Sequence, residues 1–376
     1  MKHHSFVVDS IESFCSSMDE ILTVDFKPNV GIVFSSIKIG IPELARAMNN
    51  YTIDFIGSSS CGEILSINEK SSVFEGSCVV TLLEIDKNFY KIVSVNGEGK
   101  TSFDLGKEVG KSGKQLFESP AFIIVCSSLN TDGEQLVKGL VDSCGPEVPI
   151  FGGLAGDDSL FKETFVFGNG FFLTNGALAL IFDNTRIKVD GIATSGWIGL
   201  GAEKTVTRAE GNVVYTIDNE SALDFYIKYL GVDEHDLPEI GVEYPMLVMR
   251  PDGANVLRAV MMVDLEVRSL IFAGTVPEGA KVKFSSSPGF EVVDFVKKDL
   301  KKYFEIFPES DLLLLFSCMA RHMAVGPMVE EEIVEAARLW NLPVTGFFTY
   351  GEIGKNMVGN CDFFNETFTL VTLKEQ

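Results

Sequence analysis

The chain of 376 residues has no hydrophobic run of the length that a membrane-spanning helix requires. Such a helix needs about 20 predominantly apolar residues. The densest runs are far shorter: AFIIV at 121–125, ALALIF at 177–182 and LLLLF at 312–316. Runs of this length are typical of buried strands. The N-terminus also has no apolar leader with a small-residue cleavage site. We therefore expect no membrane insertion and a cytoplasmic location.

Basic residues are scarce in this chain. Lysine and arginine number 31 against 53 aspartates and glutamates, which gives a formal net charge of −22. A field of this sign repels phosphate backbones and anionic lipid surfaces. The composition therefore argues against nucleic acid as a partner. Hydrophobic residues still make up 46% of the chain, which is enough for a sizeable packed core.

Cysteine occurs seven times, always singly, and the chain has no C-x-x-C pair. An odd number of scattered thiols fits neither a disulfide framework nor a zinc ribbon. We therefore expect reduced cysteines in a reducing compartment, most of them acting as small buried hydrophobic groups.

Familiar catalytic signatures are missing as well. The sequence contains no P-loop, no H-E-x-x-H and no G-x-G-x-x-G after a predicted strand. GSSSCG at 57–62 is not a G-x-S-x-G elbow, because Cys61 takes the place of the last glycine. Two of the four histidines lie at the N-terminus, which leaves His235 and His322 as candidate bases. A catalytic site needs matched parts, so we expect a binding protein rather than an enzyme, with a Cys318-dependent hydrolase as an alternative.

What the sequence does contain is a repeated unit. GSSSCGEI at 57–64 and GFFTYGEI at 346–353 both keep a glycine, four other residues and then Gly-Glu-Ile. Each turn belongs to the same order of predicted elements: an apolar strand ending in small polar residues, a helix, a second strand, the turn and a later strand. These elements are predicted at 30–36, 41–50, 52–57 and 78–85 in the first unit, and at 311–318, 327–340, 342–346 and 367–375 in the last.

A middle unit is similar but less regular. It has an apolar strand at 121–128, a helix at 131–144 with Thr131 as its N-terminal cap, and a second strand at 148–153. Here Gly156-Asp157 is predicted to take the place of the Gly-Glu pair.

The order of these elements predicts the fold class. A strand–helix–strand order favours parallel pairing, and the strands that follow favour antiparallel additions. We therefore predict a mixed α/β (α+β) fold of repeated strand–helix–strand units with mixed sheets. Predicted strands at 191–218 and a helix at 221–232 that ends at Gly231 divide the chain. We expect two closely packed domains, 1–217 and 218–376.

The glycine turns are candidate ligand sites, because ligands of open α/β sheets bind beyond the carboxyl ends of strands. Glu63, Asp157 and Glu352 each follow a turn glycine. A carboxylate in this position either accepts backbone N–H groups and fixes the turn or contacts a ligand. Residues that differ between the two matched turns, such as Cys61 and Tyr350, are candidates for specificity.

The stretch FSCMARHMAVGP at 316–327 places a thiol, a guanidinium and an imidazole within five residues. Arg321 is suited to hold a ligand carboxylate at two points, or to form a structural ion pair. His322 is a candidate metal or haem-iron ligand, or a solvated imidazole. Cys318 is either a site thiol or a small buried residue.

Five motifs taken in order carry a resemblance to a known family. They are GSSSCGEI, FGGLAGDD, RAVMMVDLE followed by LIFAGTVPEG, FSCMARH and GFFTYGEIG. In this order and spacing they resemble the FIST sensory proteins, which have FIST N and FIST C regions. The resemblance covers about residues 25–370 and implies a FIST N-like domain at 1–217 and a FIST C-like domain at 218–376. It also implies a ligand-sensing module of bacterial signal transduction, with amino acids as proposed ligands.

A branch of stand-alone members of this family, the NosP type, binds haem, senses nitric oxide and modulates a partner histidine kinase. The resemblance thus implies a stand-alone sensor, with haem-based nitric oxide sensing as one hypothesis and an amino-acid sensor without haem as the alternative. In the haem hypothesis His322 is the axial ligand. The candidate ligand-binding residues are Cys61, Glu63, Gly153, Asp157, Cys318, Arg321, His322, Tyr350 and Glu352.

Overall fold

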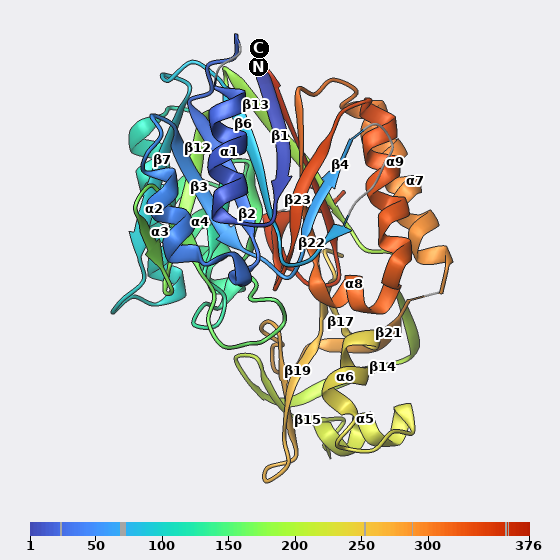
Figure 1. Cartoon of the computed structure of the whole chain (residues 1–376). Helices are drawn as coiled ribbons and strands as arrows, with labels where there is room; N and C mark the ends of the chain where they lie inside the picture. Colours follow the sequence, from blue (N-terminus) through green and yellow to red (C-terminus); the bar gives the residue numbers. More distant parts are fainter. Residues whose placement is uncertain (23–24, 68–72, 252, 288, 358, 360) are drawn as a thin grey trace.

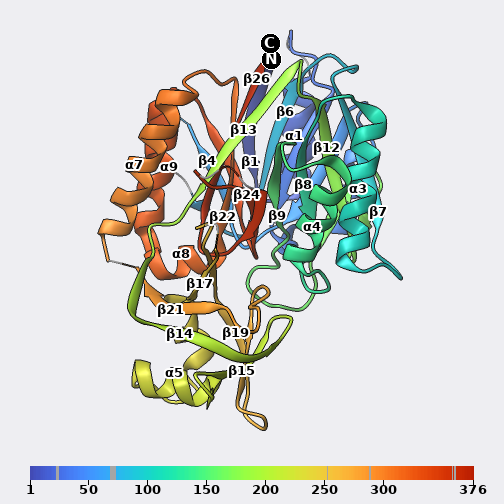
Figure 2. The same ribbon diagram turned by 180° about the vertical axis from the view of Figure 1, so that it is seen from behind.

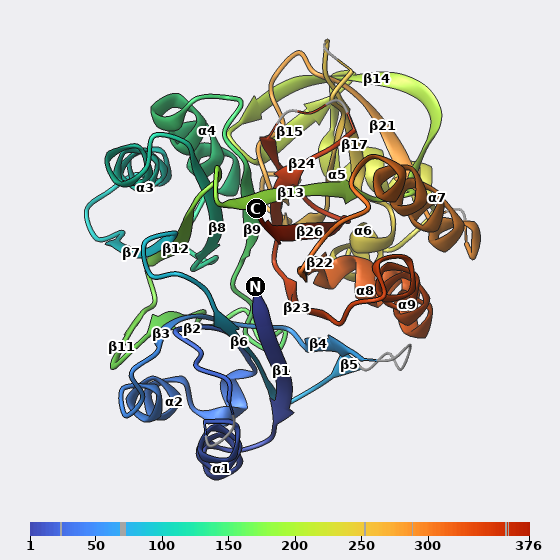
Figure 3. The same cartoon turned by 90° about the horizontal axis from the view of Figure 1, so that it is seen from above.

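Three similar α/β units surround a common centre, and both chain termini lie at this centre when the molecule is viewed from above (Figure 3). The structure, a computed structural model, describes residues 1–376 except 23–24, 68–72, 252, 288, 358 and 360. A further group of strands and helices, inserted in the third unit, projects from one end of the molecule (Figure 1).

Each unit runs strand, helix, strand, helix, strand, hairpin and strand. The first unit comprises β1 (Lys2–Val8), α1 (Ile11–Ile21), β2 (Val30–Ser35), the 3-10 turn η1 (Ile37–Ile39), α2 (Ile41–Met48), β3 (Asp54–Ser59), β4 (Glu63–Ser66), β5 (Val73–Phe74) and β6 (Cys78–Glu84). The second comprises β7 (Tyr90–Asn96), α3 (Ser102–Leu116), β8 (Pro120–Cys126), α4 (Gly133–Cys144), β9 (Ile150–Leu154), β10 (Val166–Gly168), β11 (Phe171–Leu173) and β12 (Gly176–Asp183). The third comprises β13 (Ile187–Thr194), α7 (Glu291–Ile306), β22 (Leu312–Cys318), α8 (Met319–Val325), the 3-10 turn η2 (Gly326–Met328), α9 (Val329–Trp340), β23 (Val344–Thr349), β24 (Glu352–Lys355), β25 (Cys361–Phe364) and β26 (Phe368–Glu375).

The three units build three six-stranded sheets with the same plan. Their strand orders are β1-β6-β2-β3-β10-β11, β7-β12-β8-β9-β24-β25 and β13-β26-β22-β23-β4-β5. The pairs β2/β3, β8/β9 and β22/β23 are parallel, and the neighbouring strands are antiparallel. These mixed sheets and repeated strand–helix–strand units confirm the predicted fold class.

Each sheet is completed by a hairpin from another unit. The hairpin β10–β11 of the second unit extends the first sheet, β24–β25 of the third extends the second, and β4–β5 of the first extends the third. No unit therefore finishes its own sheet. The exchange covers strand edges that would otherwise be open to other chains.

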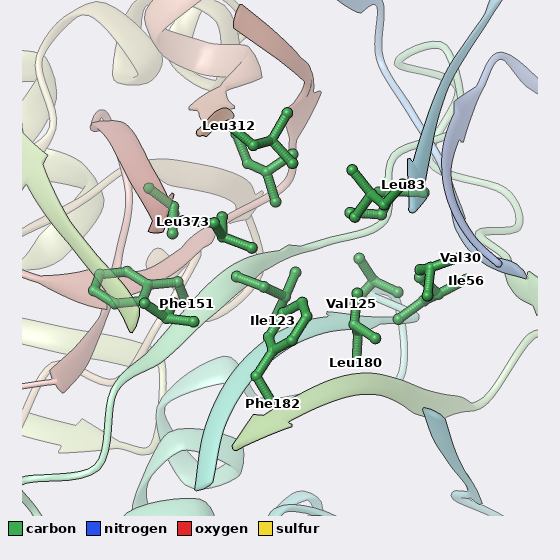
Figure 4. Close-up of a cluster of buried hydrophobic side chains, with 14 of the residues drawn as sticks. Val30, Ile56, Leu83, Ile123, Val125, Phe151, Leu180, Phe182, Leu312 and Leu373 are labelled. Carbon is green, nitrogen blue, oxygen red and sulfur yellow. The ribbon is translucent and has the colours of Figure 1, made fainter. Parts of the chain in front are cut away.

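The main core lies where the three sheets face one another. Figure 4 shows Val30, Ile123 and Leu312 with their side chains directed into this shared space. The ring of Phe34 stacks on that of Phe347 with centroids 4.4 Å apart. Strands β2, β8 and β22 are buried along their whole length. Burial on both faces explains why these strands are continuous apolar runs in the sequence rather than alternating patterns.

Helices cover the outer face of each sheet (Figure 3). Helices α1 and α2 pack on the first sheet, α3 and α4 on the second, and α7 and α9 on the third. Each helix turns an apolar stripe inward, such as Phe14 and Met18 of α1. None of the helices in the described ranges is long and apolar enough to cross a membrane.

The inserted region, residues 198–286, forms a separate layer below the three units (Figure 1, Figure 2). It comprises β14 (Ile198–Glu210), β15 (Val213–Ile217), β16 (Glu220–Ser221), α5 (Ala222–Leu230), α6 (Leu237–Glu243), β17 (Met246–Met249), β18 (Val256–Arg258), β19 (Val260–Asp264), β20 (Ser269–Phe272) and β21 (Lys281–Ser286). As predicted, α5 ends at Gly231, which adopts a left-handed conformation (φ 70°).

Two local predictions for the middle unit are wrong. The cap of α4 is Asp132, whose side chain accepts from the amide of Gln135, and not Thr131. The expected equivalence of Asp157 with the two turn glutamates also fails. In the third sheet Glu63 pairs with Phe347, and in the second sheet Glu352 pairs with Gly153. In the first sheet the residue at the equivalent position is Val166, which pairs with Ser58, and not Asp157. The middle unit has a longer loop before its hairpin, and Asp157 lies in that loop.

The domain boundary after residue 217 stays a prediction. It falls within the inserted region, between β15 and β16. Strands from both sides of it share sheets, because β4 pairs with β23 and β24 pairs with β9.

Candidate functional site

The second parallel strand of each unit ends on the same side of the molecule, and the turns that follow meet there. The amide of Cys61 donates to the carbonyl of Phe348 at 2.9 Å. The amide of Tyr350 donates to the carbonyl of Leu154 at 3.1 Å, and that of Gly156 to the carbonyl of Ser59 at 3.0 Å. The three turns thus bind one another in a ring. We call this arrangement the turn ring.

Glu63 fixes the first turn from inside the protein. Its fully buried carboxylate accepts hydrogen bonds from the Ser60 hydroxyl, from the Ser77 hydroxyl at 2.6 Å and from the Ser77 amide at 3.2 Å. Burial raises the pKa of Glu63 to about 7, so protonated and ionised forms both occur near neutral pH.

Glu352 makes the matching contacts in the third unit. It accepts from the Thr349 hydroxyl, from the Thr367 hydroxyl at 2.7 Å and from the Thr367 amide at 3.3 Å. Burial raises the pKa of Glu352 to about 8. Both glutamates therefore have the turn-fixing contacts expected of an acid after a turn glycine. Contact of either with a ligand stays a prediction.

Asp157 organises the loop of the middle unit and joins it to the third turn. Its carboxylate accepts from the amides of Phe161 (2.9 Å), Lys162 (2.6 Å) and Glu163 (3.0 Å), and from the hydroxyl of Tyr350. The Tyr350 ring stacks on Phe161, with centroids 4.6 Å apart. Burial raises the pKa of the Tyr350 hydroxyl, with further contributions from Cys61 and Asp157.

Cys61, Asp157 and Tyr350, one from each unit, are thus brought together. Burial raises the pKa of the Cys61 thiol to about 11. Gly156 allows this approach, because a Cβ at its position would lie 2.4 Å from the Cys61 sulfur. Gly153 has a similar role, because a Cβ there would lie 2.6 Å from Thr349 Cγ2.

Arg321 is fully buried and its guanidinium is already engaged. It holds Glu332 at two points, with Nε 3.1 Å from Oε2 and Nη2 bonded to Oε1. Nη1 donates to the carbonyls of Ser195 and Glu366. The two-point contact expected with a ligand carboxylate is made here with the chain's own Glu332.

Cys318 and His322 lie on either side of Arg321 in sequence but face different surroundings. Cys318 ends β22 in the interior, and burial, with Glu352 and Glu366 nearby, raises the pKa of its thiol. His322 lies on α8 rather than in a loop and stacks on Phe348, with centroids 4.2 Å apart. Burial lowers the pKa of His322, which favours a neutral imidazole at pH 7.

A cavity of about 1050 Å³ lies elsewhere, between α4 and the inserted region. Its wall comes from α4 (Glu134, Val137, Lys138, Val141, Asp142), from Phe103 of α3, from β17 and the residues after it, from Thr275 and 277–281, and from Cys361 and Asp362 of β25. None of the nine candidate residues from the sequence lines it.

Two ion pairs join the inserted region to the units at this cavity. Arg258 is fully buried and contacts Glu134 of α4, with Nη2 3.0 Å from Oε2, while its Nη1 donates to the carbonyl of Phe363 at 3.2 Å. Arg250 pairs with Asp362. Although burial opposes it, the charges of Arg258 and Lys138 lower the pKa of Glu134.

The sequence did carry one sign of the contact between the inserted region and α4. Arg258 lies within the apolar run VLRAVMMV, and a charge in a buried strand requires a partner. That partner, Glu134, lies 124 positions away in sequence, so only the fold could identify it.

Comparison with known families agrees with this architecture. The model of the FIST N domain matches residues 29–220, and that of the FIST C domain matches residues 222–355. The chain belongs to the FIST family. FIST domains are sensory domains of signal transduction and bind small-molecule ligands. The two FIST matches meet inside the inserted region, at Ser221, the last residue of β16.

One curated relative of this FIST protein is the uncharacterized protein MJ1623 of Methanocaldococcus jannaschii. The two are 25% identical over 219 residues, which is 54% of this chain and 41% of the relative. The match therefore spans less than half of that protein.

Proposed function

We propose that this FIST protein senses a small organic molecule that binds in the cavity between α4 and the inserted region. The observation that carries the proposal is the cavity itself, whose volume of about 1050 Å³ suits an organic ligand. It lies at the junction of two parts of the structure, a common place for ligand sites. Its wall combines apolar residues such as Val137, Val141 and Val248 with the Arg250–Asp362 ion pair.

The position of the cavity supports a sensing role. A ligand there contacts α4 of the second unit and β17 of the inserted region at once. A ligand shifts a conformational equilibrium only by its differential affinity for the two states. A ligand that contacts both parts has this differential affinity. It binds most tightly when α4 and the inserted region are spaced so that both contact it, and it therefore favours that conformation.

We propose binding rather than catalysis. The cysteine-dependent hydrolase alternative requires a thiolate nucleophile beside a base. Burial raises the pKa of the Cys318 thiol, and that of the Cys61 thiol to about 11. Both shifts favour the unreactive thiol.

Haem-based nitric oxide sensing is the finer hypothesis for this family, with His322 as axial ligand. His322 stacks on Phe348 beside the turn ring and does not line the cavity. The residues of the cavity wall therefore do not fit a haem held by His322. An absorbance spectrum of haem-loaded protein, compared with His322→Ala, tests a haem site elsewhere. Without a Soret band that changes in this variant, the haem hypothesis fails.

We propose a cytoplasmic location and signalling through contact with a partner such as a histidine kinase. All seven cysteines are free, which suits a reducing compartment. Measuring autophosphorylation of candidate kinases with and without the protein tests the partner.

A thermal-shift screen of small metabolites, amino acids included, tests the ligand site. A ligand that binds the native state raises the melting temperature. Val141→Trp on α4 fills the cavity and should abolish the shift. Gln135→Trp on the same helix, which does not line the cavity, is the matched control. A ligand whose shift survives Val141→Trp binds elsewhere and overturns the assignment.

A further inference from the structure

Glu366 is the most anomalous charged residue in the described part of the chain. It lies between β25 and β26, is fully buried, and neither carboxylate oxygen has a hydrogen-bond partner among the described residues. The side-chain oxygen of the adjacent Asn365 is likewise buried and without a partner. A buried acceptor without a donor is costly, and protonation only replaces the charge with an O–H that also needs a partner.

The backbone of Glu366 is unusual too. Its φ is 59°, in the left-handed region that disfavours residues with a Cβ. The equivalent residue of the first unit is Gly76, with φ 68°. The equivalence follows from the next residue, since Ser77 bonds Glu63 just as Thr367 bonds Glu352. The third unit therefore keeps a strained glutamate where a glycine meets the same structural need, which points to a use for its carboxylate.

The charged and titratable groups around Glu366 leave it without a donor. Arg321 lies nearby, but its guanidinium bonds Glu332 and two carbonyls. Glu352 is itself an acceptor, of hydrogen bonds from Thr349 and Thr367. The buried thiol of Cys318 also makes no hydrogen bond to the Glu366 carboxylate. Burial and the proximity of Glu352 raise the pKa of Glu366, while Arg321 opposes this. What this buried site lacks is a cation or hydrogen-bond donor.

We infer that Glu366 and the Asn365 side-chain oxygen bind a compact monovalent cation, ammonium or an alkali ion of similar size. Glu352, whose pKa burial raises to about 8, is mostly protonated at pH 7. The Glu366 carboxylate beside a neutral Arg321–Glu332 pair then calls for one positive charge. Within the described residues no group of three or more His, Cys, Asp or Glu is arranged to hold a metal ion, which argues against a divalent ion. This site is independent of the proposed cavity ligand.

A cation bound at Glu366 should alter the environment of the segment that leads into the inserted region. Arg321 bonds the carbonyl of Ser195, and its guanidinium lies over the ring of Trp197, 5.1 Å from the centroid. These residues link β13 to β14. The indole N–H of Trp197 is buried and has no partner among the described residues. Because the ring contacts Arg321, the fluorescence of Trp197 should report on the site.

Thermal melting in different chloride salts tests the inference. At equal ionic strength, about 100 mM potassium or ammonium chloride should raise the melting temperature by about 2 °C or more over tetramethylammonium chloride. The larger of the two shifts distinguishes ammonium from potassium. Glu366→Gln and Glu366→Gly should lose the shift, and Glu309→Gln, at an exposed glutamate, should keep it. Equal shifts in wild type and Glu366→Gly, or none in wild type, overturn the site.

A second readout needs no change at Glu366. Trp197 and Trp340 are the two tryptophans of the chain. In Trp340→Phe the emission therefore reports on Trp197 alone, and titration with the active salt should shift it in a saturable way. An emission that follows ionic strength alone, equally in tetramethylammonium chloride, contradicts a specific cation site.

Discussion

At the scale of single residues, buried acids shape the end of the molecule where the three turns meet. Glu63 and Glu352 are both held by hydroxyl groups and a backbone amide, and burial raises both pKa values. A carboxyl whose pKa is higher in the folded state binds its proton more tightly there. Its contribution to stability is therefore lost as pH rises from the unfolded pKa through the folded one.

For Glu352 the raised pKa predicts that the protein loses stability as the pH rises, and in which pH range. Its folded pKa is about 8 against an ordinary value of 4.5. We expect the wild-type free energy of unfolding to fall between about pH 5 and pH 8, by up to about 4 kcal/mol from this group. Glutamine cannot ionise, so in Glu352→Gln the free energy of unfolding should fall less steeply with pH. Urea unfolding at pH 5, 6.5 and 8 measures this pH dependence. An identical slope would mean that Glu352 is already ionised in the fold.

Arg321 provides a second prediction at this scale. Arg321→Ala leaves Glu332 buried without its partner and should lower the free energy of unfolding by about 3–5 kcal/mol. The matched control is Arg46→Ala, which removes the exposed pair with Glu43 and should cost no more than about 0.5–1 kcal/mol. Urea denaturation measures both. Similar losses would contradict a structural role for Arg321.

At the scale of elements, the start of α4 matters because this helix lines the cavity. Asp132 caps it through the amide of Gln135. We expect Asp132→Ala to destabilise the protein by about 1 kcal/mol. Thr131→Ala, one residue earlier, should cost clearly less. Denaturation midpoints of the two variants distinguish the observed cap from the one predicted by sequence, and a larger loss for Thr131→Ala would favour the latter.

At the scale of the whole molecule, exchange of hairpins makes the three units depend on one another. Residues 1–217 contain β4 and β5, which belong to the third sheet, and lack β24 and β25, which complete the second. We therefore expect neither 1–217 nor 218–376 to form a stable fold when it is produced alone, so that neither shows a cooperative thermal transition. Co-expression of the two pieces should restore the folded structure. Circular dichroism melts of each piece test this. A cooperative transition in either piece would show that the predicted boundary separates autonomous domains.

The sequence by itself determined the repeated unit and the class of fold. Apolar runs such as those of β2 and β22, glycine turns and helix periodicity are local signals, and these properties need no knowledge of distant contacts. The matched position of Glu63 and Glu352 could likewise be seen in the letters alone.

Only the tertiary structure decided where these pieces meet. Exchange of hairpins between units, the pairing of Arg258 with Glu134 and the capture of Arg321 by Glu332 all join residues by packing rather than by spacing. The same holds for Asp157, which lies in a longer loop than the sequence pattern suggested. It also holds for Glu366, because the lack of a donor for its carboxylate among the described residues is visible only in the folded chain. Local patterns fix which element a residue joins, whereas charge partners and cavities depend on which elements face each other.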